Sequence, residues 1–365
     1  MQKINNIEIK NFKSIRHQKI EGCKRINVFI GYPNVGKSNI LEALSLFSID
    51  EPDADFSSFI RMEELTTLFF NGNINEKLEI RLNKRNRIVT SLLESNKIIF
   101  VWQMADDDLT FDKMTSDDKI YHMLSYVKAQ DKNKVLSWDS IFKRQPRSPE
   151  FYGKIENDSL VAIKKYSFEK NINYTSGKYD SLSVPNGENI FDIIYTHADI
   201  RKEIANLFES YNLRLLYNST EKKFSILKNL SDDVIFTIPY ELVADTLQRL
   251  IFYKTAILTN KDSILLFEEP EAHMFPPYIS KLTTDIIFDE NNNQYFIATH
   301  SPFILSEFIE EAQNDLAIYV VDYDKGETII KRLTDEQVIE VAQYGIDLFF
   351  NLEPYLDKYG EPHSA

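Results

Sequence analysis

The sequence predicts an α/β fold, with mixed β-sheets and helices arranged around a phosphate-binding loop. Residues 31–38 read GYPNVGKS and fit the pattern G-x-x-x-x-G-K-[ST]. The apolar run INVFI at 26–30 predicts a buried strand before the loop, and residues 39–48 predict a helix after it. The run at 263–267 is apolar without alternation, as strands of parallel sheets are, and 294–299 reads as another such strand.

The phosphate loop predicts a nucleotide site. A strand, a glycine-bounded loop and a helix N-terminus form a cradle in which backbone N–H groups and the helix dipole face an anion. We expect Lys37 to reach the β- and γ-phosphates of ATP and Ser38 to hold Mg²⁺. A loop that only turns the chain would not account for the Lys–Ser pair. The expected nucleotide contacts are Gly31, Asn34, Val35, Gly36, Lys37, Ser38 and Asn39.

Two further motifs follow predicted strands and supply catalytic candidates. The sequence LLFEEPEAH places Glu268 and Glu269 at a strand end, where we expect Glu268 to hold Mg²⁺ and Glu269 to act as general base for the attacking water. His300 follows the strand 294–299 and is expected to sense the γ-phosphate and hold that water. Lys37, Glu269 and His300 are therefore the predicted catalytic residues.

Composition narrows the function classes. The chain has 365 residues, 43% of them apolar and 27% charged, as in ordinary globular proteins. A net charge of −14 argues against a protein whose whole surface grips nucleic acid. Without a run of 18 apolar residues no membrane span is expected. Cys23 is the sole cysteine, which excludes an intrachain disulfide and fits a cytoplasmic location.

Charge is unevenly distributed along the chain. Basic residues gather in 3–37 and again in 77–97, and residues 106–118 are strongly acidic. These clusters are read either as solvated faces or as a local DNA groove on an acidic body. DNA therefore stays among the candidate partners.

The nucleotide-binding motifs come from both ends of the chain. We expect a head formed by residues 1–102 and 221–365, with 103–220 inserted as an arm or lobe for oligomer or partner contacts. The insert is polar and predicts helices at 117–130 and 189–210. Pro239 is expected to open a long helix that runs from Tyr240 to about Leu258.

The motifs GYPNVGKSN, LLFEEPEAH and IATHSP together resemble the ABC-type ATPase heads of the SMC/Rad50/RecF superfamily, and more closely the OLD-like ATPases of the AAA_15/AAA_21 group. The opening IEIKNFKSI is similar to that group's first strand and turn, and the resemblance covers about 1–50 and 235–335. It implies a sandwich of mixed sheets and two heads that close face to face over two ATP molecules. It also implies that Asn11 and Lys13 lie near the nucleotide.

The sequence departs from the family pattern in two places. The region before the Glu–Glu strand should offer a Gly-bearing helix N-terminus to the partner's γ-phosphate, but it reads PYELVADTLQR, where Glu241 and Asp245 bring negative charge. Slow basal hydrolysis is therefore expected. The residues after His300 leave no room for the Toprim nuclease of OLD proteins, and we read Asp322 and Asp324 as part of a closing hairpin. For the family's metal-sensing glutamine, Gln103 is a weak candidate.

The leading interpretation is a stand-alone ATPase that acts as sensor and motor in bacterial anti-phage defence. It would form a homo-oligomer and control a separate effector, a nuclease or toxin. Such an ATPase resembles the ATPase subunits of PARIS or Septu, or an abortive-infection protein. One alternative is a RecF-like recombination ATPase on gapped DNA, which the chain length favours. RecF-type heads, however, carry D-[DE]-x-x-S-E-L-D and lack the histidine. The other alternative is a nucleotide-binding scaffold with little turnover, which the signature region favours.

Overall fold

The computed structural model describes residues 3–48, 56–83, 86–94, 97–104, 162–170, 172–175, 180–209, 211–218, 221, 223–231 and 234–356. The helix predicted at 117–130 and the acidic stretch at 106–118 lie outside the described residues.

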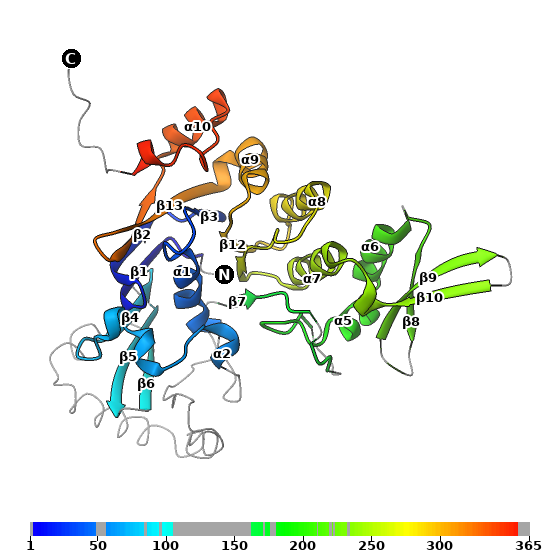
Figure 1. Cartoon of the computed structure of the whole chain (residues 1–365), viewed down its shortest axis with the longest axis horizontal. Coiled ribbons are helices and arrows are strands. Elements are labelled where there is room, and N and C mark those ends of the chain that lie inside the picture. Colours follow the sequence, from blue (N-terminus) through cyan, green and yellow to red (C-terminus); the bar gives the residue numbers. More distant parts are fainter. Residues whose placement is uncertain are drawn as a thin grey trace.

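A six-stranded sheet forms the centre of the molecule, in the order β14-β13-β3-β12-β11-β7 (Figure 1). Neighbouring strands from β13 to β7 run parallel, and β14 pairs antiparallel with β13 at one edge. The strands are β3 (Ile26–Ile30), β7 (Ile163–Tyr166), β11 (Ile264–Glu268), β12 (Gln294–Ala298), β13 (Leu316–Asp324) and β14 (Glu327–Arg332). The carboxyl ends of β3, β11 and β12 therefore meet at one edge, where ligands of such sheets bind.

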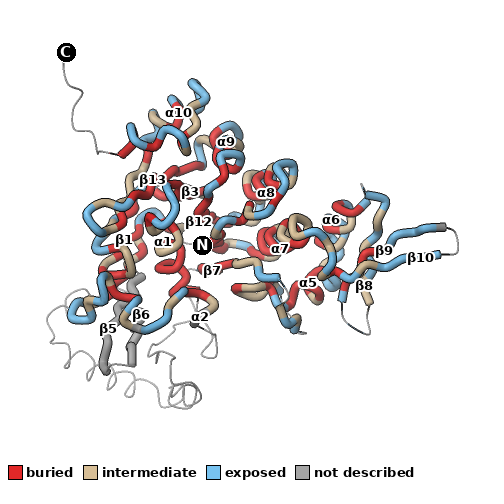
Figure 2. The backbone as a smooth tube through the Cα atoms, viewed as in Figure 1, coloured by how far each residue is buried: buried red, intermediate tan, exposed pale blue. Residues whose placement is uncertain are grey.

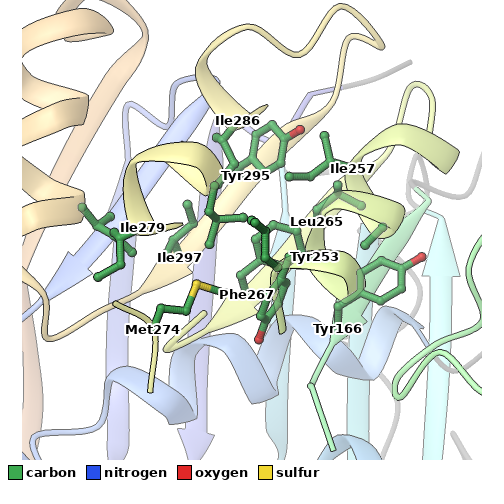
Figure 3. Close-up of a cluster of buried hydrophobic side chains, with 14 of the residues drawn as sticks. Tyr166, Tyr253, Ile257, Leu265, Phe267, Met274, Ile279, Ile286, Tyr295 and Ile297 are labelled. Atoms are coloured by element: carbon green, nitrogen blue, oxygen red, sulfur yellow. The ribbon is translucent and has the colours of Figure 1, made fainter. Parts of the chain in front are cut away.

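Helices cover one face of this sheet. They are α7 (Asp245–Thr259), α8 (Pro276–Ile287) and α9 (Pro302–Glu311), with α10 (Asp335–Tyr344) beside α9. Figure 3 shows Leu265, Phe267 and Ile297 in the apolar cluster that joins the strands to these helices, together with Tyr253 of α7. Both faces of the central strands are buried, which explains why their sequences are apolar without alternation.

The opposite face packs on the loop helix and on a second sheet. The helix α1 (Lys37–Ser45) and the antiparallel sheet β2-β1-β4-β5-β6 share an apolar cluster with Phe29, Leu266 and Phe296 of the central strands. The strands of this sheet are β1 (Asn6–Phe12), β2 (Ile15–Glu21), β4 (Leu78–Leu82), β5 (Asn86–Glu94) and β6 (Lys97–Met104). A one-turn helix, α2 (Phe56–Phe59), follows α1.

A lobe made of two helices and a third sheet projects from the helical side of the head (Figure 1). It consists of α5 (Ile190–Thr196), α6 (Ala198–Glu209) and the antiparallel sheet β8 (Arg214–Asn218), β9 (Lys223–Ser231) and β10 (Val234–Pro239). Rings of Phe191, Phe224 and Tyr240 pack edge to face inside it. The outer part of the β9–β10 hairpin is exposed, as Figure 2 shows.

Three predicted boundaries differ from the structure. The boundary expected between residues 220 and 221 falls inside one antiparallel sheet, because β8 pairs with β9. Residues 163–166, assigned to the insert, form β7, which pairs with β11 inside the central sheet. The helix predicted from Tyr240 begins only at Asp245, and Pro239 ends β10. The link between strand and helix begins with a 3-10 turn (Tyr240–Leu242), and extended backbone at Val243 separates this turn from α7. The side chain of Gln248 donates hydrogen bonds to the carbonyls of Val243 (2.7 Å) and Glu241 (3.4 Å), which holds the link in this form. Across the described ranges, no helix combines the length and apolar character needed to span a membrane.

Candidate nucleotide-binding site

The phosphate loop connects β3 to α1 and needs glycine at both of its ends. Gly31 has φ +154°, and a Cβ there would lie 2.1 Å from the carbonyl oxygen of Val321. Gly36 has φ +103°, and a Cβ there would lie 2.2 Å from Oγ1 of Thr328. Because neighbouring strands approach so closely, no other residue fits at these two positions without displacing them.

Three side chains outside the loop's turn hold it in place. The hydroxyl of Thr328 donates to the carbonyl of Val35 (2.8 Å) and lies 2.6 Å from the hydroxyl of Ser14. Asn39, an expected nucleotide contact, donates its amide to Ser14 (2.6 Å). The loop is therefore clamped by the β1–β2 turn and by β14.

Lys37, Glu269 and His300 come together at the carboxyl ends of the central strands. Nζ of Lys37 donates to the carbonyls of Gly31 (2.9 Å) and Tyr32 (2.8 Å). Nε2 of His300 lies 3.6 Å from Oε1 of Glu269. The backbone N–H of Glu269 donates to the carbonyl of the last residue of β12 (2.8 Å), which joins the ends of β11 and β12. Sequence reasoning proposed this trio, and the structure brings its members to the same edge of the sheet.

The three groups influence one another's protonation. Burial lowers the pKa of Lys37 to about 8, and the nearby carboxylate of Glu269 opposes that change. Burial also lowers the pKa of His300, the charge of Lys37 lowers it further, and Glu269 raises it. At neutral pH His300 is therefore largely a neutral imidazole, which can accept a hydrogen bond at one nitrogen and donate at the other.

Glu268 lies in a cluster of charged side chains. Its carboxylate is 3.1 Å from Nη2 of Arg61 and 3.8 Å from Nζ of Lys165. Glu42, fully buried on α1, pairs with Arg61 (2.7 Å) and with Lys13. The cluster thus joins the loop helix, the strand end and the β1–β2 turn.

Sequence reasoning missed Glu42, Arg61 and Lys165. A glutamate among the apolar residues of the loop helix was a usable signal for Glu42. No such signal marked Lys165, because the sequence around β7 shows no clear strand or helix pattern. Lys13 was expected near the nucleotide, and the structure places it in this cluster, where it also lines a hollow with Arg61 and Thr67.

Asn11 takes a supporting position. Its side-chain amide donates to the carbonyls of Asn73 (3.0 Å) and Glu76 (2.7 Å), and its oxygen accepts from the N–H of Phe70 (3.1 Å). These three bonds hold the loop before β4. Gln103, the candidate for the metal-sensing glutamine, lies on β6 of the antiparallel sheet. The strand beside β11 is β7 instead, and the residues that follow it, 167–170, read SFEK and include no glutamine.

The two acidic residues of the signature region are both partnered. Asp245 pairs with Lys170 (2.5 Å), and this hydrogen bond lowers the pKa of Asp245. Glu241 pairs with Lys223 (3.3 Å). Both acids were expected to bring negative charge to a partner's γ-phosphate, and these lysines reduce that charge. Thr246 donates to the carbonyl of a residue in the turn after β11 (2.9 Å), which ties the start of α7 to that turn.

Several basic residues of the first cluster are paired with acids. Lys10 contacts Glu8 (3.1 Å), and Lys24 contacts Asp335 (3.1 Å). Arg25 contacts Asp315 (2.9 Å).

Asp322 and Asp324 lie on β13 of the closing hairpin, as expected. Over the described ranges, no group of three His, Cys, Asp or Glu side chains is gathered closely enough to hold a metal ion on its own.

This fold and loop define a P-loop ATPase head of the ABC type. A protein-family profile for AAA_21, described as "AAA domain, putative AbiEii toxin, Type IV TA system", matches residues 26–306. The chain belongs to this family.

The chain is also similar in sequence to individual curated proteins. The chain is 22% identical over 393 residues to an ATP/GTP phosphatase of Helicobacter pylori, an alignment that covers 98% of this chain and 100% of the relative. It is 36% identical over 152 residues to protein ea59 of Escherichia phage lambda, covering 40% of this chain and 24% of that protein.

Two solved structures share the fold. One is an Smc head bound to the C-winged helix domain of ScpA (TM-score 0.52, 16% identity, 93% of this chain and 100% of that chain). The other is the Smc head domain of Pyrococcus furiosus with an extended coiled coil, bound to the C-terminal domain of ScpA (TM-score 0.52, 14% identity, 94% and 99%).

Proposed function

We propose that the protein binds ATP with Mg²⁺ and hydrolyses it to ADP and phosphate. Turnover is slow because the start of α7 carries no glycine that would let its backbone approach a partner's nucleotide closely. The observation that carries this proposal is the convergence of Lys37, Glu269 and His300 from three separate parts of the chain. Glu269 accepts a proton from the attacking water, whose oxygen bonds to the γ-phosphorus. The bond from phosphorus to the β–γ bridging oxygen breaks, and ADP and phosphate leave. His300 holds the water and contacts the γ-phosphate.

The residues present fit both ligands. The glycines at both ends of the loop let its backbone pack directly against β13 and β14, and Lys37 supplies a buried cation at the base of the loop. Ser38 at the start of α1 offers a hydroxyl oxygen that would hold Mg²⁺. Glu268 at the end of β11, whose carboxylate is paired with Arg61 and Lys165, would hold the ion directly or through water. Mg²⁺ would neutralise phosphate charge during the reaction.

We further propose that two heads close face to face over ATP. Large apolar side chains adjoin the site segments and are exposed: Tyr32, Leu242, Phe275 and Phe303. Exposed apolar residues around a polar site are typical of a surface that a partner covers. A second copy would present the start of its α7 to the nucleotide of the first.

The biological role that we propose is that of a sensor and motor subunit in anti-phage defence, of the OLD-like PARIS or Septu kind, controlling a separate effector. The family description, which mentions a putative AbiEii toxin and a Type IV TA system, supports this proposal. The RecF alternative has less support, because the similarity to RecF of Thermoanaerobacter covers 13% of this chain.

Two measurements test the proposal: ATP turnover, followed as phosphate release, and ATP affinity. The wild type should turn over ATP in the presence of Mg²⁺, and Lys37→Ala should bind ATP at least about a hundredfold more weakly because the cation at the β- and γ-phosphates is lost. Lys254→Ala serves as control, since Lys254 pairs with Asp285 on α8, away from the loop. Wild-type affinity in Lys37→Ala would refute the site. Strong stimulation by gapped DNA would favour the RecF-like alternative, and binding without turnover would favour a scaffold.

A further inference from the structure

Glu271 is a buried carboxylate for which the proposed reaction has no role. It lies in the turn between β11 and α8, two residues after Glu269, and is nearly inaccessible to solvent. In the described part of the chain no Lys, Arg or His forms an ion pair with it, and its Oε2 atom has no hydrogen-bond partner. Burial raises its pKa. The buried Glu42, in contrast, is paired with two cations. Burying a carboxylate without a cation is costly, and such groups concentrate at functional sites.

The other oxygen of Glu271 holds the turn that carries His300. Oε1 accepts the hydroxyl of Thr299 (2.5 Å) and the backbone N–H of His300 (3.1 Å). Oγ1 of Thr299 in turn accepts the N–H of Ser301 (2.9 Å). Both bonds of this one oxygen atom therefore go to consecutive residues of the segment 299–301. The turn before α9 is fixed by a side chain from the turn that also carries the proposed general base.

We propose that Glu271 is a positioning residue for ATP hydrolysis, which sets the place of His300 relative to Glu269. The inference rests on the proposed function. Oε1 of Glu271 joins the two turns, and the imidazole of His300 lies 3.6 Å from Glu269 across them. If that link is cut, His300 moves while the phosphate loop keeps its clamps at Ser14 and Thr328. Misplacement by about 1 Å costs on the order of a hundredfold in rate.

A double-mutant cycle tests the proposal. Glu271→Ala should lower kcat about 10- to 100-fold and change KM less than about threefold. His300→Ala should lower kcat similarly, and the double variant should lie within about threefold of His300→Ala alone, because both act through one group. Glu271→Gln keeps an oxygen that accepts from Thr299 and His300, so it should recover most of kcat. Thr299→Val, a variant of similar size, removes the hydroxyl bond to Glu271 and the bond that this hydroxyl accepts from Ser301, so it should also lower kcat.

Glu307→Ala is the matched control. The carboxylate of Glu307 also accepts two hydroxyl groups, those of Ser280 and Thr283, but it links α8 to α9 away from His300. It should lower the melting temperature without lowering kcat.

Three results would overturn the inference: losses of Glu271→Ala and His300→Ala that multiply in the double variant, a rise in KM with kcat unchanged, or an equal loss of kcat in Glu307→Ala. If the wild type hydrolyses ATP and the cycle is multiplicative, only the role of Glu271 is wrong. If the wild type shows no hydrolysis at all, the proposed function fails first and the inference fails with it.

Discussion

Nε2 of His300 lies 3.6 Å from Oε1 of Glu269, and the two residues follow neighbouring parallel strands. A water molecule held by both groups would lie near the phosphate loop, where Lys37 is found. The reaction therefore depends on the order of strands in the sheet, because β12 lies between β3 and β11.

Replacing Glu269 separates nucleotide binding from turnover. Glu269→Gln should bind ATP as the wild type does and lose at least about a hundredfold in kcat, because the amide cannot accept the proton of the water. The ATP-bound form should then accumulate as a closed dimer. Light scattering and small-angle scattering with and without ATP would show a change of mass or shape. An unchanged mass and shape would rule out closure by isolated heads.

ATP affinity should weaken in alkaline solution. The pKa of Lys37 is lowered to about 8, so the nucleotide-free protein loses this cation above that pH, and binding must then take up a proton. The dissociation constant should be flat below about pH 8 and rise above it by up to about tenfold per pH unit. Titration with a fluorescent ATP analogue measures the effect. His300→Asn should show the same dependence, and a constant affinity from about pH 7 to about pH 9.5 would contradict the assignment to Lys37.

The close approach of β14 to the loop can be tested at Gly36. A Cβ at this position meets Oγ1 of Thr328 at 2.2 Å, so Gly36→Ala should move the loop and lower ATP affinity by about tenfold or more. Gly326 also has a positive φ (+86°), but nothing lies within 4 Å of its Cβ position. Gly326→Ala therefore shares the backbone strain without the collision. Equal effects of the two variants on ATP affinity would show that the contact with Thr328 is unimportant.

The part of the insert that precedes β7 can be tested by a deletion that spares this strand. Replacing residues 105–161 with a short linker keeps Lys165 and the edge strand beside β11. This variant should bind ATP within about threefold of the wild type and should lose the oligomer or partner contacts proposed for the insert. Isothermal titration and size measurements would show both effects. A folded deletion variant without ATP affinity would place the insert in the site.

Sequence patterns predicted those parts of the site that depend on contiguous residues. Lys37 is marked by the loop motif, and Glu269 and His300 by the strands that end just before them. Glu271 stands in the same motif as Glu269, but its contacts with the turn of His300 depend on how two turns pack. Lys165 could not be predicted, because a four-residue edge strand with two lysines lacks the pattern of a buried strand.

The predicted start of α7 at Tyr240 was wrong for a similar reason, because the helix begins at Asp245. A proline before an apolar, periodic stretch favours a helix N-terminus, and Pro239 precedes such a stretch. The burial of Tyr240 and the hydrogen bonds from Gln248 to the carbonyls of Glu241 and Val243 hold residues 240–244 outside the α-helix α7. These are tertiary contacts, which the local sequence does not reveal.

The clamp of Thr328 on the phosphate loop has a consequence for synthesis on the ribosome. The loop is synthesised before β12 and β13, the strands that flank β3, and the hydroxyl that bonds to Val35 lies 293 residues further along the chain. A nascent chain therefore carries the complete phosphate-loop sequence long before the loop has its shape. Truncated products that stop before β13 should remain without nucleotide, so that only chains extended past Thr328 become able to respond to ATP.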